Sequence, residues 1–160
     1  ALFASGAQKI AIITGANNTG APSDYRLAGY KQTMEKYGAE KTILQIDNGT
    51  STTLKNLEIE RLLQNKTVDG IFCTDDLTAI TVMNIAQKLK ISIPEELKVI
   101  GYDGTKLIKR IAPQLSTIVQ PIDEMCDVMI DLLLRRMMDP DVALEENYPI
   151  PIQLSLSESC

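Results

Sequence analysis

The sequence contains no histidine, and this absence narrows the chemistry open to the protein. Histidine is the commonest general base and metal ligand near neutral pH. Its absence therefore argues against acid–base catalysis and against many kinds of metal site. Cys73 lies within an apolar run and has no histidine to activate it, which favours a place in the core over a role as nucleophile. We therefore expect a protein that is not an enzyme and that requires no cofactor or metal ion.

Aromatic residues are scarce, at 4% of the chain, and tryptophan is missing. Hydrophobic residues nevertheless make up 44% of the 160 residues, which is enough for one domain with an aliphatic core. The three cysteines, Cys73, Cys126 and Cys160, are widely spaced and form no Cys-x-x-Cys pair. A reduced chain in the cytoplasm is the simplest interpretation of that spacing.

Signals for nucleic acid, membrane and nucleotide binding are also absent. The net charge is −5 with no basic run, so the chain is a poor candidate for gripping phosphate backbones by itself. No apolar stretch approaches the length of a membrane span, and no signal peptide is visible. The first residue is not Met, which indicates a fragment or a processed chain. The loop from Gly15 to Gly20 continues with Ala21 instead of Lys, so the P-loop pattern fails, as does the dinucleotide-binding glycine pattern.

Short apolar runs alternate with helix-like segments five times along the chain. Strands are expected at residues 9–14, 41–46, 68–73, 97–101 and 116–119, with a last strand at 150–156 that Pro151 interrupts. Helices are expected from Ser23 or Asp24 to about 37, from Thr52 or Thr53 onward, from Asp75 or Asp76 to 89, and at 106–111 and 121–138. This alternation predicts an α/β fold with a doubly wound parallel sheet.

The spacing of apolar residues also predicts which helix positions face the core. The inward positions expected from it are Leu27, Tyr30, Met34, Tyr37, Leu54, Leu57, Leu62, Leu63, Ile80, Met83, Ile85 and Leu89.

Ligands of doubly wound sheets bind beyond the carboxyl ends of the strands, which points to the loops 15–24, 47–51, 74–76 and 102–105. Arg26, close to the first loop, can donate in pairs to hydroxyls or a carboxylate, and its alternative is a solvated helix-surface arginine. One of Asp75 and Asp76 caps a helix, which leaves the other to face the cleft. Asp103 lies between Gly101 and Gly104 in Gly-Tyr-Asp-Gly, where small neighbours favour close approach of a ligand over a plain turn aspartate.

Five motifs in this order resemble the lactose-repressor/galactose-repressor family of bacterial transcription regulators. They are KIAII at 9–13, RLAGY at 26–30, DGIFCTDDLTA at 69–79, IPEELKVIGYD at 93–103 and PQLSTIVQP at 113–121. The Gly-Tyr-Asp-Gly-Thr variant is most similar to the subgroup of sucrose- or ribose-operon repressors. The resemblance implies a periplasmic-binding-protein-like effector domain of two α/β lobes with a ligand between them.

The resemblance also implies a division of this chain. Residues 1–121 match the C-terminal lobe, residues 122–147 a helix and connection that belong to the missing N-terminal lobe, and residues 148–160 the strand that crosses back. Without that second lobe, the apolar side of the helix at 122–138, with Met125, Met129 and Leu132, needs another cover. We expect self-association or disorder there.

Site residues follow from the same matches. The resemblance implies that Arg26, Asp75 and Asp103 bind the effector, a sugar or sugar phosphate. Arg26 and Asp103 correspond to residues that bind it in the family. Asp75 falls where many members have Asn, and a carboxylate only accepts hydrogen bonds. Ile80 and Ile111 match positions at the homodimer interface, with plain core packing as the alternative for both. Operator DNA is bound only through a headpiece that this chain lacks, and no membrane contact is implied.

Two other functions remain open at this point. One is a transport-type sugar-binding protein of the same fold. The other is a Mg²⁺-dependent phosphotransfer or hydrolase domain that uses Asp75, Asp76 and Asp103 as metal ligands.

Overall fold

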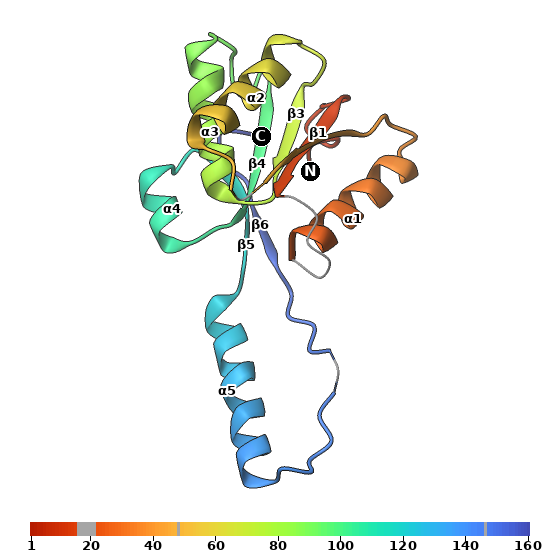
Figure 1. Ribbon diagram of the computed structural model, residues 1–160, viewed down its shortest axis with the longest axis vertical. Coiled ribbons are helices and arrows are strands. Elements are labelled where there is room, and N and C mark those ends of the chain that lie inside the picture. The colour runs from red at the N-terminus through yellow and green to blue at the C-terminus, as the bar shows by residue number, and fades with distance from the viewer. Residues whose placement is uncertain (16–21, 48, 146) are drawn as a thin grey trace.

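The computed structural model describes residues 1–15, 22–47, 49–145 and 147–160 (Figure 1). Strands and helices alternate along the chain in the predicted order. The elements are β1 (Ile10–Gly15), α1 (Pro22–Lys36), β2 (Thr42–Ile46), α2 (Thr52–Gln64), β3 (Gly70–Cys73), α3 (Asp76–Lys88), β4 (Lys98–Asp103), α4 (Lys106–Ile111), β5 (Ser116–Val119), α5 (Ile122–Met138) and β6 (Gln153–Ser155).

One six-stranded sheet, in the order β2-β1-β3-β4-β5-β6, organises the fold. The first five of these strands are parallel and the chain order reverses between β1 and β3, which confirms the doubly wound α/β prediction. The last strand is the exception, because β6 pairs antiparallel with β5. It is also shorter than the predicted 150–156, since Pro151 has no N–H to donate and pairing starts only at Gln153.

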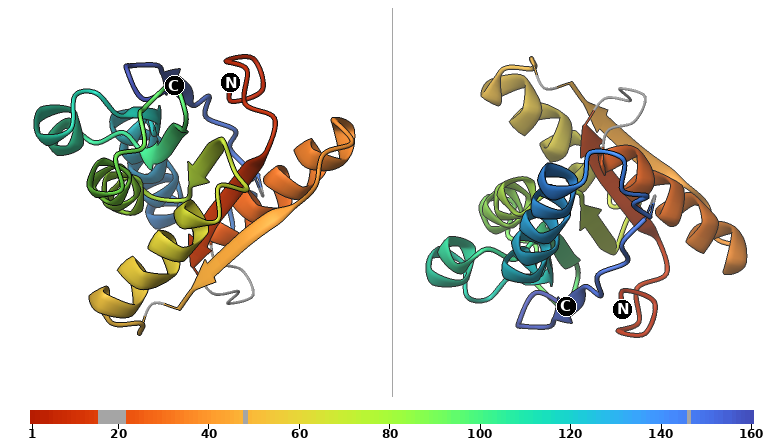
Figure 2. Two further views of the ribbon diagram at one scale, coloured as in Figure 1. Left: turned by 90° about the horizontal axis from the view of Figure 1, so that it is seen from above. Right: turned by 90° about the horizontal axis from the view of Figure 1, so that it is seen from below.

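Alternate residues of β1 supply the two halves of the core. Ala11 and Ile13 face the cluster that α2, α3 and α4 cover, whereas Ile10 and Ile12 face the cluster that α1 covers. Figure 2 shows α1 across the sheet from α2 and α3. Residues 2–6 form a turn, and Leu2 and Ala7 pack in the cluster on the α1 side. The carboxyl ends of β1, β3, β4 and β5 therefore meet at one edge between two covered faces.

Most predicted core positions are confirmed, but three are wrong. Tyr37 is 59% exposed because α1 ends at Lys36 and the chain turns through Gly38, which has a positive φ. Leu54 and Leu57 are also exposed. The buried stripe of α2 runs instead through Ile59 and Leu63, and at 100° per residue the two exposed leucines lie on other sides of that helix.

The predicted start of the first helix is also wrong. The helix α1 begins at Pro22, so Ser23 and Asp24 lie inside its first turn and neither is the N-cap. Proline suits the first turn because its missing N–H would have no partner there.

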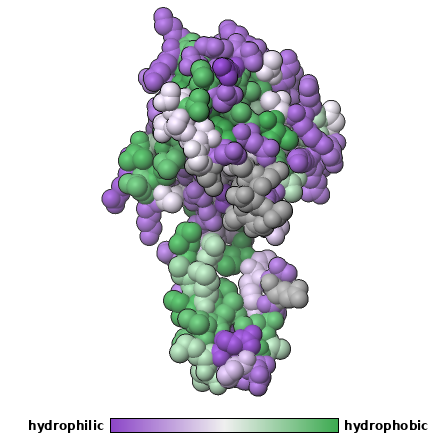
Figure 3. Space-filling view, in the orientation of Figure 1, coloured by the Kyte–Doolittle hydropathy of each residue, from purple (hydrophilic) through white to green (hydrophobic). Residues whose placement is uncertain are grey.

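The helix α5, residues 139–145 and residues 147–152 form an extension that leaves the body of the protein (Figure 1). Within α5 no residue is buried. The apolar side chains exposed on α5 are Ile122, Met129, Ile130, Leu133, Leu134, Met137 and Met138, and Figure 3 shows a hydrophobic surface over this region. The helix is continuous, so the predicted alternative of disorder is not observed, whereas its self-association stays a prediction. None of the described helices is both long and apolar enough to cross a bilayer.

We predict that Gly101→Ala destabilises the fold by about 1–3 kcal/mol, the usual cost of overpacking. A Cβ at position 101 would lie 2.3 Å from Oδ1 of Asp76 and 3.3 Å from the Cβ of Ala79, so α3 must move away from β4. Gly29→Ala in α1 is the matched control, because nothing lies within 4 Å of its Cβ and alanine favours a helix by up to about 1 kcal/mol. Urea unfolding measures both variants, and equal stabilities of the two would contradict the prediction.

Candidate functional site

The candidate site lies at the carboxyl edge of the sheet, where β3, β4 and β5 end. Asp103 is the last residue of β4, Thr74 follows β3, and Gln120 follows β5. Arg26 reaches the same edge from the second turn of α1. Asp103 is thus a strand residue, which makes the turn-aspartate alternative wrong. Residues 16–21 of the first predicted loop and Asn48 of the second lie outside the described residues.

Two contacts hold the Arg26 side chain in place. Its Nη1 donates to the carbonyl oxygen of Thr74 at 2.6 Å, and its Cζ lies 3.7 Å from the centre of the Tyr102 ring. A carbonyl and an aromatic face together fix the plane of a guanidinium. The alternative of a freely solvated surface arginine is therefore wrong, and the remaining N–H groups of Arg26 are oriented before any ligand arrives.

Asp103 is held through its side chain and through its backbone. Nε2 of Gln120 donates to Oδ1 of Asp103 at 2.7 Å, and the Gln120 backbone N–H donates to the Asp103 carbonyl oxygen at 3.2 Å. Asp103 has a φ of 124°, a conformation that non-glycine residues rarely adopt. Burial raises the pKa of Asp103, although the hydrogen bond from Gln120 and the charge of Arg26 each act to lower it.

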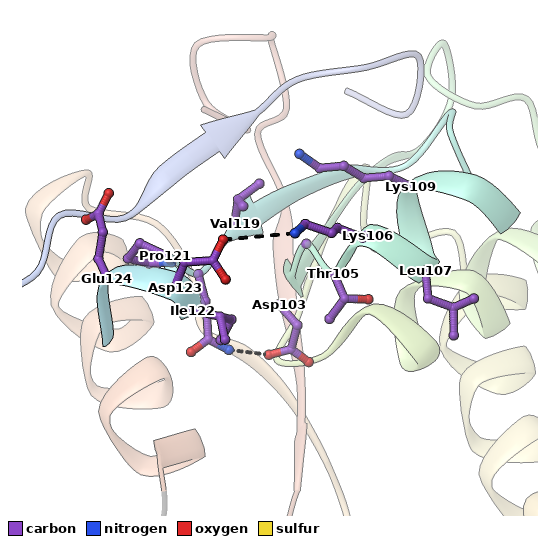
Figure 4. A pocket seen from close by; sticks show the side chains of 12 residues that line it. Asp103, Thr105, Lys106, Leu107, Lys109, Val119, Pro121, Ile122, Asp123 and Glu124 are labelled. Atoms are coloured by element: carbon purple, nitrogen blue, oxygen red, sulfur yellow. Dashed lines mark hydrogen bonds and ion pairs between the residues drawn. The ribbon is translucent and has the colours of Figure 1, made fainter. Parts of the chain in front are cut away.

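Two grooves meet at this edge. One, of about 570 Å³, lies between the starts of α4 and α5 and is lined by Asp103 and Gln120; Figure 4 draws the hydrogen bond that Asp103 accepts there. Lys106 and Asp123 face each other across it at 3.9 Å. The other, of about 810 Å³, lies on the α1 side and is lined by Arg26, Tyr102 and Gln120 together with apolar residues. Because Gln120 borders both grooves, the structure brings Arg26 and Asp103 into one neighbourhood.

Asp75 is the N-cap of α3, and this role engages both of its carboxylate oxygens. The backbone N–H of Thr78 donates to Oδ1 at 2.7 Å, and the Thr78 hydroxyl donates to Oδ2 at 2.7 Å. The ammonium group of Lys55 in turn donates to the Thr78 hydroxyl at 2.7 Å. The capping prediction is confirmed, and a contact of Asp75 with an effector stays a prediction.

Asp76 does not face the cleft, and the expectation that the second carboxylate would do so is wrong. Its side chain is 2% exposed and points into the body. The backbone N–H of Gly104 donates to Oδ2 at 2.7 Å, and the hydroxyl of Thr117 donates to Oδ1 at 2.5 Å. Burial raises the pKa of Asp76, and the two hydrogen bonds offset part of that rise.

The glycines of the Gly-Tyr-Asp-Gly turn serve this packing. Gly101 leaves room for the Asp76 carboxylate, and Gly104, with a φ of +61°, has the Cα of Val119 only 2.7 Å from where a Cβ would lie. Close approach of a ligand to these glycines stays a prediction. Their small size is required by contacts within the body.

Asp75, Asp76 and Asp103 do not converge on one point. Each is held by donors of its own, and among the described residues no group of three His, Cys, Asp or Glu side chains is placed to hold a metal ion. The three carboxylates that the phosphotransfer or hydrolase alternative would use as metal ligands are therefore not arranged as one set among the described residues. Cys73 is fully buried within β3, which confirms its expected place in the core, and burial raises the pKa of its thiol.

Two residues of the site were missed by the sequence reasoning. Gln120 follows β5 in the way that Asp103 ends β4, so the strand-end rule alone was sufficient to find it. Tyr102 contacts Arg26 because α1 packs beside β4. This contact joins residues far apart in the chain, so the local sequence pattern does not predict it.

A family model described as "Periplasmic binding protein-like domain" matches residues 1–160, the whole chain. The chain belongs to this family. It is also 40% identical over 154 residues to the "Sucrose operon repressor" of Lactococcus lactis subsp. lactis, a match that covers 96% of this chain and 46% of that protein. This domain therefore spans about half the length of the curated relatives it matches.

Solved structures give the same assignment. The fold is similar, with a TM-score of 0.84 and 27% identity over 99% of this chain and 59% of the other, to a periplasmic binding protein/LacI transcriptional regulator from Alkaliphilus metalliredigens complexed with D-xylulofuranose. It is similar, with a TM-score of 0.81 and 27% identity over 99% and 58%, to a LacI family regulator from Enterococcus faecium with bound ribose. The resemblance to the lactose-repressor/galactose-repressor family is confirmed.

We predict a defined pH dependence of stability from Asp103. Because burial raises the pKa of Asp103 in the folded chain, its contribution is complete below the ordinary carboxyl pKa and is lost as the pH rises through the raised value. Asp103→Asn should remove this contribution, so the difference in unfolding free energy between wild type and variant should change in urea titrations as the pH rises above the ordinary carboxyl pKa of about 3.9.

Glu35→Gln is the control of opposite sign. The pKa of Glu35 is lowered through its hydrogen bond to Lys41, so its contribution is present at high pH and is lost as the pH falls. A difference between wild type and Asp103→Asn that does not vary with pH would contradict the prediction for Asp103.

Proposed function

We propose that this chain is the effector-sensing part of a bacterial transcriptional repressor and that it binds a sugar or sugar phosphate between this lobe and a second one. The observation that carries the proposal is the pairing of a fixed donor, Arg26, with a fixed acceptor, Asp103, at the carboxyl edge of a periplasmic-binding-protein-like sheet. Relatives named as sucrose operon repressors, and structurally similar regulators with D-xylulofuranose or ribose bound, support it.

The chemistry of the site suits neighbouring hydroxyl groups. A guanidinium donates to hydroxyl oxygens and a carboxylate accepts from hydroxyl protons, so Arg26 and Asp103 together match both halves of a diol. Together with Asp75, the proposed effector contacts are two carboxylates and one guanidinium. These contacts favour uncharged hydroxyls, so a phosphate on the effector would be bound by other groups.

The second lobe would use the extension. Residues 1–121 form the C-terminal lobe, residues 122–147 belong to the second lobe, and residues 148–160 cross back. The exposed apolar side chains of α5 support this division, because burying them against a partner sheet is strongly favourable. The two crossing segments pair as far as Val119 and Gln153, directly before Gln120, whose side chain donates to Asp103.

Sugar binding would act on DNA through the arrangement of the lobes. An effector with different affinities for two lobe arrangements shifts their populations, and a headpiece outside this chain responds by binding or leaving the operator in the cytoplasm. The relatives with this fold are regulators, which supports a role in binding rather than catalysis. A transport-type sugar-binding protein would use the same site, and the repressor relatives favour the regulator.

A homodimer formed through the C-terminal lobe is part of the proposal. Ile111 at the end of α4 is 59% exposed, which suits an interface. Ile80 of α3 is partly buried and packs against the core, as the core-packing alternative expects, and its place at the interface rests on the resemblance. Leu77 and Leu107, at 66% and 65% exposure, add apolar surface to the same two helices.

We predict that Arg26→Ala weakens effector binding at least about tenfold, a loss of roughly 1.4 kcal/mol. The measurement is calorimetry of the full-length protein against sucrose, fructose, ribose and their phosphates. Arg61→Ala is the matched control, because Arg61 lies on the surface of α2 and pairs with Glu58. The site assignment fails if none of these sugars binds or if Arg26→Ala binds as the wild type does.

We predict that Ile111→Glu shifts the full-length protein from dimer to monomer, because a carboxylate cannot be buried in an apolar interface without a partner. Light scattering at several protein concentrations measures the mass. Tyr25→Glu, at a residue of α1 that is 76% exposed on the other side of the sheet, is the control and should remain dimeric. A dimeric Ile111→Glu would place the interface elsewhere.

A further inference from the structure

One buried carboxylate joins the three elements that surround the candidate site. Asp76 opens α3, and its two oxygens bind the Gly104 amide in the β4–α4 connection and the Thr117 hydroxyl in β5. Asp76 is 2% exposed and Thr117 is likewise 2% exposed, so water does not compete for these bonds. A single side chain therefore sets how α3, β4 and β5 sit relative to one another.

The bonds of Asp76 act directly beside the proposed effector residue. Asp103 has a φ of 124°, a conformation that non-glycine residues rarely adopt. Such a conformation persists only where the surroundings fix it. Gly104, which follows, has a φ of +61°, which glycine adopts without strain. The Gly104 amide is bound by Asp76, and the Asp103 carbonyl oxygen is bound by the Gln120 amide, so the strained residue is held from both sides.

The space around Asp76 is reserved for it. The nearest strand residue, Gly101, has no side chain, and an added Cβ there would lie 2.3 Å from Oδ1. Burial of a carboxylate is unfavourable in itself, which its raised pKa reflects. Because burying the Asp76 carboxylate is energetically unfavourable, we attribute its presence to the geometry that it enforces and not to stability alone.

We propose that Asp76 is a positioning residue for the effector site. By fixing the Gly104 amide and Thr117, it holds Asp103 in the orientation in which its carboxylate accepts from Gln120 and is available to ligand hydroxyls. The value of this orientation for effector binding rests on the proposed function, whereas the orientation itself does not.

The proposal distinguishes two substitutions at one position. Asp76→Asn keeps an oxygen for the Gly104 N–H and offers an N–H₂ group to the Thr117 oxygen, so the geometry should survive the loss of charge. Asp76→Ala leaves the Gly104 amide and Thr117 hydroxyl without this partner, so the loop should relax. Val82→Ala is the matched control, because Val82 is fully buried in the same helix and contacts neither group through hydrogen bonds.

The first test needs no ligand. In NMR spectra of this chain, Asp76→Ala should shift both the Gly104 amide and the Gln120 side-chain amide, which reports the contact with Asp103. Asp76→Asn should leave the Gln120 signal in its wild-type position, and Val82→Ala should move neither. If Asp76→Ala does not fold, Thr117→Val, which removes one of the two bonds, replaces it. An unmoved Gln120 signal in Asp76→Ala or Thr117→Val overturns the proposal.

The second test measures binding in the full-length protein with sucrose, fructose and ribose as probes. Asp76→Ala should weaken the binding of whichever probe the wild type binds by at least tenfold, while Asp76→Asn and Val82→Ala stay within threefold. Equal weakening in Asp76→Ala and Val82→Ala would show a general loss of stability and overturn the positioning role. If the wild type binds no probe, the proposed function fails, and the NMR test still decides whether Asp76 orients Asp103.

Discussion

The carboxylate of Asp76, buried between α3, β4 and β5, is the interaction on which the geometry of this edge depends. Its oxygens accept hydrogen bonds from the Gly104 amide and the Thr117 hydroxyl. The Asp76 carboxylate also leaves no room for a residue larger than glycine at position 101. A buried polar group that lacks a hydrogen-bond partner is energetically unfavourable, so buried hydrogen bonds strongly restrict the geometry of the groups that form them. In our proposal, the two hydrogen bonds of Asp76 hold the end of β4 in the conformation in which Asp103 has a positive φ.

Around that constraint, the site consists of groups that are oriented before a ligand arrives. Arg26 lies on the ring of Tyr102 and donates to the Thr74 carbonyl oxygen, while Asp103 accepts from Gln120. Side chains already held in one rotamer lose less entropy when a ligand binds. The body thus presents a set of fixed polar groups to a ligand. The helix α5 extends from the same edge, and none of its residues is buried.

Sequence patterns predicted the elements well, because the signals are local. Apolar runs marked the strands, and Asp75 followed by a helical period marked the start of α3. The spacing of apolar residues did not always predict which side of a helix is buried. Leu57 is apolar, yet it lies outside the buried stripe of Ile59 and Leu63 on α2. Arg26 and Asp103 could be singled out because a strand end or a helix start next to a sheet edge can be recognised from local sequence, whereas their contact with an effector stays a prediction.

The sequence by itself determined the α/β alternation, the cap at Asp75, the core position of Cys73 and the lack of a histidine-based mechanism. Only the tertiary structure decided which of two adjacent aspartates would be buried. Asp75 and Asp76 have the same chemistry, but successive residues at a helix start point about 100° apart, so one meets its own helix and the other meets β4. That choice depends on the docking of α3 against Gly101, a contact between residues far apart in sequence.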